Sequence, residues 1–164
     1  MDYNKHMHRA YLQAQYSHDP STQNGAVLLD SFGIVSFGVN NFPSGVEESS
    51  DRWERPKKYS FIEHAERTAI FNVARMGYCT TGTTLVCPWA ACADCARAIV
   101  VSGVARLVRV SSGDNTHARW DESVAWGDEI MREGGVEIIE IDYEHPEGEV
   151  PIKLRRNGEI LVIK

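Results

Sequence analysis

The hydrophobic and polar positions along the chain predict a series of helices and strands. Apolar side chains recur every three or four residues in the segments predicted as helices, and they form short runs in those predicted as strands. The predicted helices span residues 3–16, 63–76, 93–102 and 119–133, and the predicted strands span residues 25–30, 34–39, 83–89, 104–110, 136–141, 150–155 and 159–163. The polar segment 40–58 is punctuated by Gly and Pro and is predicted as a long loop.

Turn residues mark the ends of several of these elements. Residues 31–33 turn the first two strands into a hairpin, Gly77 ends a helix, and Asn157-Gly158 is a strong two-residue hairpin signal near the C-terminus. From residue 63 onward helices and strands alternate, which implies right-handed crossovers and a largely parallel sheet. We therefore expect one three-layer α/β/α domain over residues 1–164, with a core at about 3–142 and a C-terminal β-hairpin at about 150–163.

Length and composition are those of an ordinary globular domain. The chain has 164 residues, of which 43% are hydrophobic and 24% are charged. No segment approaches the roughly 20 apolar residues of a membrane span, and the polar N-terminus has no apolar signal-peptide core, so we expect a cytoplasmic protein. The net charge of −6 argues against a nucleic-acid partner, because binding that backbone requires clustered Lys and Arg.

The four cysteines lie close together, at Cys79, Cys87, Cys92 and Cys95. Small secreted domains instead distribute their cysteines along the chain to form disulfides. A Cys-x-x-Cys pair in a cytosolic protein indicates metal or redox chemistry. We expect Cys79 and Cys87 to be ordinary small apolar side chains.

Two short motifs each stand at the start of a predicted helix. The first is His64-Ala65-Glu66 and the second is Cys92-Ala-Asp-Cys95. One histidine and two cysteines supply the three protein ligands of a catalytic zinc site, whose fourth position is kept for water. Glu66 lies on a different side of its helix from His64 and is suited to act as general acid and base.

Other interpretations of these motifs remain open. A structural zinc site needs a fourth protein ligand, and His117 is the nearest spare candidate. A thioredoxin-like redox pair would follow the first strand of its fold and would leave His64 and Glu66 without a role. The two motifs together favour a catalytic zinc ion.

The combination resembles the signature of the zinc-dependent nucleobase deaminases. More closely, the chain is similar to the deoxycytidylate (dCMP) deaminase branch of the cytidine-deaminase-like fold, from about Ser17 to Ile141. The shared stretches are Asp19-Pro-Ser-Thr-Gln-Asn-Gly-Ala-Val27, Gly38-Val-Asn40, Pro43-Ser-Gly45, Lys58-Tyr59, His64-Ala-Glu66, Gly82-Thr-Thr-Leu85 and Cys92-Ala-Asp-Cys-Ala96. The resemblance implies a mixed five-stranded sheet and a homo-oligomer, which in the family is a hexamer.

The resemblance also implies an activity, namely the hydrolysis of dCMP to dUMP and ammonia, which supplies dUMP for thymidylate synthesis. In that reaction His64, Cys92 and Cys95 bind zinc, Glu66 moves the proton, and Asn40 hydrogen-bonds the sugar. Two positions depart from the family pattern. Ala91 stands where the family usually has proline, and Asn41 replaces a glycine in a stretch that helps to form the site of a nucleotide activator.

Further substrate contacts are expected around these motifs. Ala65 and Ala90 flank the zinc ligands, so main-chain groups there can meet the pyrimidine. Ser111 begins a loop of small polar residues, up to residue 115, at the carboxyl end of a predicted parallel strand, where ligands gather in α/β sheets. This loop and Arg119 are candidates for phosphate binding, although an ordinary polar loop explains the pattern equally well. Trp120 is placed either to stack on a base or to pack in the core.

Alternatives remain open for the role of the charged loop and for the identity of the substrate. The basic residues Arg52, Arg55, Lys57 and Lys58 are expected to be solvated, and the alternatives are contact with a phosphate, with a second nucleotide or with the acidic residues Glu47, Glu48 and Asp51. Other members of the fold act on another nucleotide such as dCTP, on a nucleoside, on a free base such as cytosine or guanine, or on adenosine in tRNA. A different class of function is a non-catalytic binding module stabilised by zinc.

Overall fold

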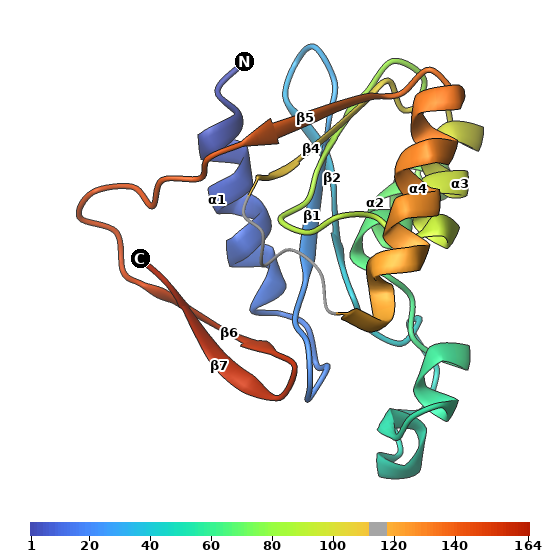
Figure 1. Ribbon diagram of the computed structural model, residues 1–164, viewed down its shortest axis with the longest axis vertical. Helices are drawn as coiled ribbons and strands as arrows, with labels where there is room; N and C mark the ends of the chain where they lie inside the picture. Colours follow the sequence, from blue (N-terminus) through green and yellow to red (C-terminus); the bar gives the residue numbers. More distant parts are fainter. Residues whose placement is uncertain (112–117) are drawn as a thin grey trace.

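A five-stranded sheet lies between two layers of helices in the computed structural model, which describes residues 1–111 and 118–164 (Figure 1). The strand order is β2-β1-β3-β4-β5. The strands are β1 (Gly25–Leu29), β2 (Ile34–Val39), β3 (Thr84–Val86), β4 (Arg106–Val110) and β5 (Glu137–Ile141). Helix α1 (Tyr3–Ala14) covers one face, and α2 (Ala65–Arg75), α3 (Ala93–Val101) and α4 (Asp121–Glu133) cover the other.

The sheet is mixed, as the family resemblance implied. β1 pairs antiparallel with both β2 and β3, whereas β3, β4 and β5 are parallel to one another. A tight turn can join antiparallel strands, but parallel strands need a crossover, and here α3 and α4 provide the two crossovers. The largely parallel sheet expected from the alternation of elements is therefore restricted to the β3–β5 half.

Side-chain alternation along β1 divides the core into two layers. Ala26 and Leu28 pack into the cluster on the α2 and α3 side, whereas Val27 and Leu29 pack into the cluster beneath α1. Successive side chains of a strand point to opposite faces, so a strand covered on both faces must be apolar throughout. This explains why β1 is an unbroken apolar run with every residue buried.

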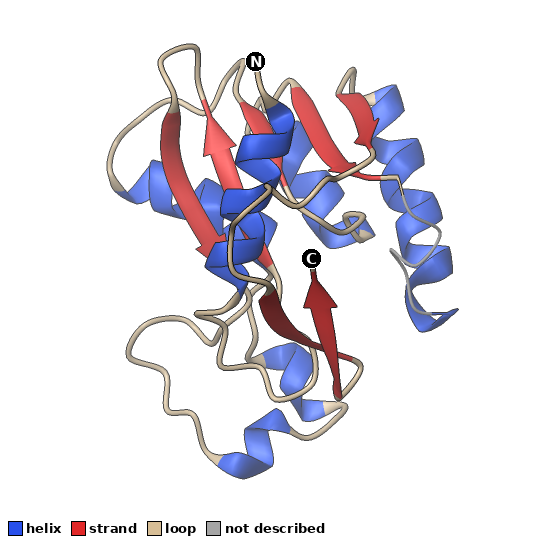
Figure 2. Cartoon of the chain, turned by 90° about the vertical axis from the view of Figure 1, so that its left-hand side faces the viewer, coloured by secondary structure: helices blue, strands red, loops and turns tan. Residues whose placement is uncertain are grey.

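The C-terminal hairpin forms a second, two-stranded sheet apart from the first (Figure 2). Its strands are β6 (Ile152–Arg156) and β7 (Glu159–Ile163). Ile152 and Leu154 are each 1% exposed and belong to the apolar cluster under α1. The hairpin is thus anchored to the α1 face by buried side chains of β6.

Several predicted boundaries move by a few residues. The strand predicted over residues 83–89 is only Thr84–Val86, because Pro88 has no N–H to continue a ladder. The predicted long loop contains two short 3-10 helices, η1 (Ser50–Trp53) and η2 (Lys57–Ser60), and a third, η3 (Ala118–Trp120), precedes α4. Within the described ranges, no helix is long and apolar enough to cross a membrane.

Candidate active site

Both zinc-ligand motifs occupy the beginnings of helices that start at the same side of the sheet. His64 is the N-cap of α2, and Cys92 is the N-cap of α3. The first turn of α2 lies directly against β2, where a Cβ atom on Gly38 would stand 1.9 Å from the carbonyl oxygen of Ala65. Only glycine permits this close approach, which sets the position of His64 relative to the sheet.

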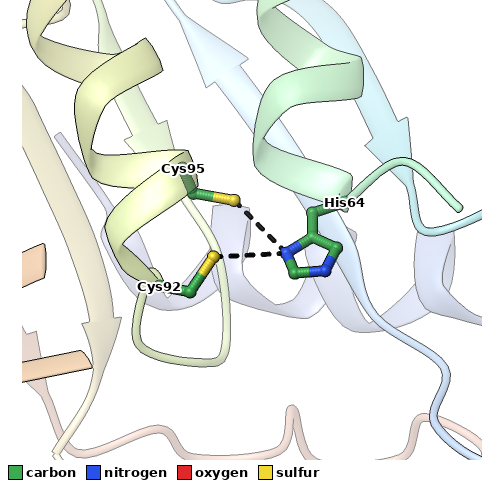
Figure 3. A group of neighbouring side chains, drawn as sticks. All are labelled: His64, Cys92 and Cys95. Atoms are coloured by element: carbon green, nitrogen blue, oxygen red, sulfur yellow. Dashed lines mark hydrogen bonds between the residues drawn. The ribbon is translucent and has the colours of Figure 1, made fainter. Parts of the chain in front are cut away.

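The three predicted ligand residues converge, as Figure 3 shows. His64 Nδ1 lies 3.5 Å from Cys92 Sγ and 3.4 Å from Cys95 Sγ, and the three donor atoms all lie within 4.8 Å of one another. A nitrogen and a sulfur that bind one zinc ion tetrahedrally, at about 2.1 and 2.3 Å, are roughly 3.5 Å apart. The donor set and its spacing therefore fit a zinc ion with one position left open.

The thiols of Cys92 and Cys95 shift each other's pKa in opposite directions. A hydrogen bond from the Cys95 thiol lowers the pKa of Cys92 to about 4, and the same bond raises the pKa of Cys95 well above its ordinary value. Metal binding requires both sulfur atoms as thiolates, so a bound ion would favour the deprotonated form of both cysteines.

Glu66 carries a buried carboxyl group, one oxygen of which has no hydrogen-bond partner among the described residues. The residue is 3% exposed, and the oxygen without a partner is Oε2. Burial raises the pKa of this carboxyl above its ordinary value. A native fold rarely leaves a buried polar atom unsatisfied, and such an atom in a cavity is typical of a functional group.

One cavity collects most of the predicted site residues. Those that line it are His64, Ala65, Glu66, Cys92, Asn40, Ala90, Arg119 and Trp120. Cys95 is fully buried behind this surface. The cavity therefore joins two of the candidate metal ligands and the Glu66 carboxyl to a space in which a small molecule can bind.

The side chain of Asn40 is largely occupied by contacts within the protein. Its Nδ2 donates to Asp19 Oδ2 at 3.0 Å and to the carbonyl of Thr22 at 2.6 Å, and its Oδ1 accepts from the N–H of Asn24 at 2.6 Å. Both amide hydrogens are used in these contacts. A sugar hydroxyl can therefore meet only the second lone pair of Oδ1.

Ser111 is the one residue of the expected phosphate-binding loop that the structure describes, and it does not line the cavity. Its hydroxyl donates to the carbonyl of Ile141 at 3.1 Å and to Asp142. Residues 112–115 and the spare candidate ligand His117 lie outside the described residues. Of the expected phosphate contacts within the described residues, Arg119 lines the cavity and Ser111 does not.

Trp120 packs in the core and also lines the cavity, and its stacking on a base stays a prediction. The core contact is with the cluster on the α2 and α3 side. Its ring meets His64 edge-on at 5.8 Å and Tyr59 at 5.7 Å between centroids. The side chain is therefore supported from behind while it presents a surface to a bound molecule.

Sequence reasoning missed several cavity residues. Lys58 was expected to be solvated, and this prediction is wrong, because its ammonium group pairs with Asp19 inside the wall of the cavity. The only available signal was the presence of both residues in the stretches that resemble the deaminase family. Trp89 and Arg156 also line the cavity, and no motif pointed to either of them.

Comparison with known proteins gives the family. Residues 1–111 match the family model described as "Cytidine and deoxycytidylate deaminase zinc-binding region". This region contains both motifs that converge in the structure. Zinc is therefore the cofactor that the family and the donor set both indicate.

Individual relatives agree with this assignment. An "Uncharacterized deaminase in luxG 3'region" of Aliivibrio fischeri is 33% identical over 129 residues, which cover 79% of this chain and 86% of the relative. The human deoxycytidylate deaminase is 31% identical over 109 residues, which cover 62% of this chain and 60% of that protein. The aligned part thus spans less than two thirds of the human protein.

A solved structure with the same fold is the dCMP deaminase of the cyanophage S-TIM5 in complex with dCMP and dUMP. It superposes with a TM-score of 0.68 at 26% sequence identity, covering 84% of this chain and 94% of that one. The expected cytidine-deaminase-like fold is confirmed by this likeness. With a family match over most of its length and the matching metal-ligand geometry, this chain belongs to the zinc-dependent cytidine and deoxycytidylate deaminase family.

Proposed function

We propose that this chain catalyses the hydrolytic deamination of dCMP, in which dCMP and water give dUMP and ammonia. The observation that carries the proposal is the buried carboxyl of Glu66, whose Oε2 atom has no hydrogen-bond partner among the described residues and which shares one cavity with the His64 and Cys92 ligands. The relatives support the choice of substrate, since they include deoxycytidylate deaminases and a dCMP deaminase in complex with dCMP and dUMP.

The residues of the chain divide the chemistry between them. His64, Cys92 and Cys95 would hold the zinc ion, which supplies an acidified water at its open position. Glu66 takes one proton from the attacking water and delivers it to N3 of the pyrimidine while the water oxygen bonds to C4. Glu66 then carries the second proton to the amino group. The C4–N bond breaks, ammonia departs, and C4 of the product becomes a carbonyl.

The other cavity residues are suited to hold the nucleotide in place. Ala65 and Ala90 bring main-chain groups next to the metal ligands, where the pyrimidine edge must lie. Trp120 offers a ring for stacking, Asn40 offers one lone pair to the sugar, and Arg119 offers a guanidinium group to the phosphate.

A substrate panel tests the proposal. Cytosine and guanine bases, nucleosides, monophosphates and triphosphates, together with tRNA, are incubated with the zinc-loaded protein, and ammonia release is measured. We expect the highest kcat/KM for dCMP. A preference for dCTP, deoxycytidine, cytosine, a guanine compound or tRNA would show that dCMP is the wrong substrate. The assignment of the zinc chemistry would still stand. Tight zinc binding without turnover of any of them would instead favour a binding module.

The assembly and the cellular setting belong to the same proposal. We expect a homo-oligomer, a hexamer by the family resemblance, acting in the cytoplasm as a single domain without nucleic acid. Phe32, Phe71, Val101 and Trp126 are large apolar side chains that are exposed in the single chain and that an oligomer would cover. Sedimentation that shows a monomer at micromolar concentration would contradict the oligomer.

A further inference from the structure

Asn24 lies at the candidate active site, directly before β1. It stands opposite Asn40, one residue beyond the β1–β2 ladder. Alternation along the strand places its side chain on the same face as those of Ala26 and Leu28, toward α2 and α3. Asn24 is 9% exposed and lines the cavity that also contains Glu66. A nearly buried side-chain amide therefore forms part of the wall of this cavity.

Contacts with Gly25 and Cys87 fix the orientation of the Asn24 amide. Its Oδ1 accepts from the main-chain N–H of Gly25 at 3.0 Å, and its Nδ2 donates to Cys87 Sγ at 3.3 Å. The Cys87 thiol also reaches Oδ1, at 3.7 Å. A main-chain N–H can only donate, so the oxygen of the amide must be the atom that faces Gly25. Cys87 is fully buried in the core cluster on the α2 and α3 side, and it therefore supports this amide from the core.

One hydrogen of Asn24 Nδ2 is left for a ligand. A side-chain NH₂ group can donate two hydrogen bonds. Among the described residues, Nδ2 donates only the bond to Cys87 Sγ. A buried donor without a partner costs free energy, because it has lost its contact with water. A molecule that binds in the cavity and accepts from this donor recovers that cost.

Asn40 supplies the complementary acceptor next to this donor. Its Oδ1 lies 2.6 Å from the main-chain nitrogen of Asn24, and its own amide hydrogens are both used within the protein, so it offers one lone pair of Oδ1. A hydroxyl both donates and accepts, so it suits a site with one acceptor and one donor. The sugar of dCMP has a single free hydroxyl, on C3′, because C5′ carries the phosphate and C2′ carries only hydrogen.

We infer that Asn24 is a specificity-determining residue that donates from Nδ2 to the 3′-hydroxyl of the nucleotide, while this hydroxyl donates to Oδ1 of Asn40. The inference rests on the proposed function, and it assigns a substrate contact to a residue outside the zinc-ligand motifs. It predicts that Asn24 selects a sugar with a free 3′-hydroxyl and takes no part in the deamination step.

A comparison of substrates with and without this hydroxyl tests the inference. Asn24→Leu and the smaller Asn24→Ala both remove the donor. Each is expected to lower kcat/KM for dCMP about three- to tenfold, the usual effect of losing one neutral hydrogen bond, while kcat/KM for 2′,3′-dideoxycytidine 5′-monophosphate stays within about twofold. Asn72→Leu is the matched control and should change neither value, since the Asn72 amide donates to the carbonyl of Phe37 outside the cavity lining.

Binding of the product gives the same comparison without turnover. dUMP and its 2′,3′-dideoxy form are titrated into the zinc-loaded wild-type and variant proteins by calorimetry, and thermal melting confirms that each protein is folded. We expect the preference for dUMP over the dideoxy form to fall about three- to tenfold in both Asn24 variants and to keep its wild-type value in Asn72→Leu. The same preference in the wild type and in the Asn24 variants would overturn the inference.

The outcomes separate this inference from the proposed function. If dCMP is the best substrate but the Asn24 variants lose dCMP and its dideoxy form equally, the inference is wrong and the proposed function stands. If dCTP or deoxycytidine is preferred and the loss in the Asn24 variants still requires the 3′-hydroxyl, the proposed function is wrong and the inference stands.

Discussion

Lys58 and Asp19 form an ion pair inside the protein, with only 6% of the lysine side chain and 2% of the aspartate side chain exposed. Asp19 also accepts the main-chain N–H groups of Ser21 and Thr22 at 2.8 and 3.1 Å and the side-chain amide of Asn40 at 3.0 Å. Burial lowers the pKa of Lys58, and its contact with Asp19 opposes that shift. The pair thus joins the long loop to the segment that precedes β1.

Removal of one partner of this pair should destabilise the fold. Lys58→Met leaves the Asp19 carboxylate buried without its counter-ion, which typically costs about 3–5 kcal/mol of the free energy of unfolding. Lys57→Met is the control, because Lys57 pairs with Asp51 where both side chains are about half exposed, and such pairs contribute about 0–1 kcal/mol. Urea denaturation measures both values. Equal stability of the two variants would show that the buried pair has no such role.

The purified protein should contain about one zinc ion per chain. Cys92→Ala and Cys95→Ala each remove a ligand and should lower the zinc content sharply, and chelation should lower the melting temperature, because metal binding stabilises the folded state. Cys79→Ala should keep full zinc, since Cys79 is exposed and lies outside the His64, Cys92 and Cys95 group. Elemental analysis measures the zinc content of each protein. Full zinc in both ligand variants would contradict the assignment.

Glu66→Gln should keep zinc and the fold but lose turnover. The carboxyl is not needed as a ligand, whereas loss of a positioned general acid and base typically slows a reaction by roughly 10² or more. An exposed glutamate of α4 offers a control, Glu129→Gln, which should leave kcat unchanged. Zinc content, melting temperature and ammonia release are measured together. Activity of Glu66→Gln within a few-fold of wild type would remove Glu66 from the mechanism.

Gly127 is the point where α4 packs against the loop that holds the first cysteine ligand. A Cβ atom there would lie 2.6 Å from the carbonyl oxygen of Ala91 and 3.2 Å from the carbonyl carbon of Cys92. Gly127→Ala should therefore lower stability by about 1–3 kcal/mol and weaken zinc binding, although alanine is the better helix former.

Substitution at a nearby exposed position of the same helix provides the comparison for Gly127. Ala125→Gly should cost only about 1 kcal/mol, from helix propensity, with zinc affinity unchanged. Denaturation curves and competition with a zinc chelator measure the two effects. Unchanged zinc affinity in Gly127→Ala would show that the packing of α4 does not position Cys92.

The sequence by itself determined the elements and the chemistry that depends on short spacing. Periodicity and turn residues located each described α-helix and strand to within a few residues, because helix and strand geometry repeats along the chain. His64 and Cys92 could be recognised because each stands at a helix start with its partner, Glu66 or Cys95, within one turn. The zinc cofactor and the family followed from these two motifs, and both are confirmed.

Only the tertiary structure decided which residues surround the cavity and in what state. The sequence predicted Lys58 to be solvated, and only the fold brings Asp19 against it. Arg156 belongs to a predicted hairpin, and it lines the cavity because β6 is anchored under α1. Ser111 fits a phosphate loop by position, yet its hydroxyl bonds to the end of β5. Burial and ion pairing depend on groups distant in the sequence, whereas hydrophobic periodicity reports only which side chains share a face.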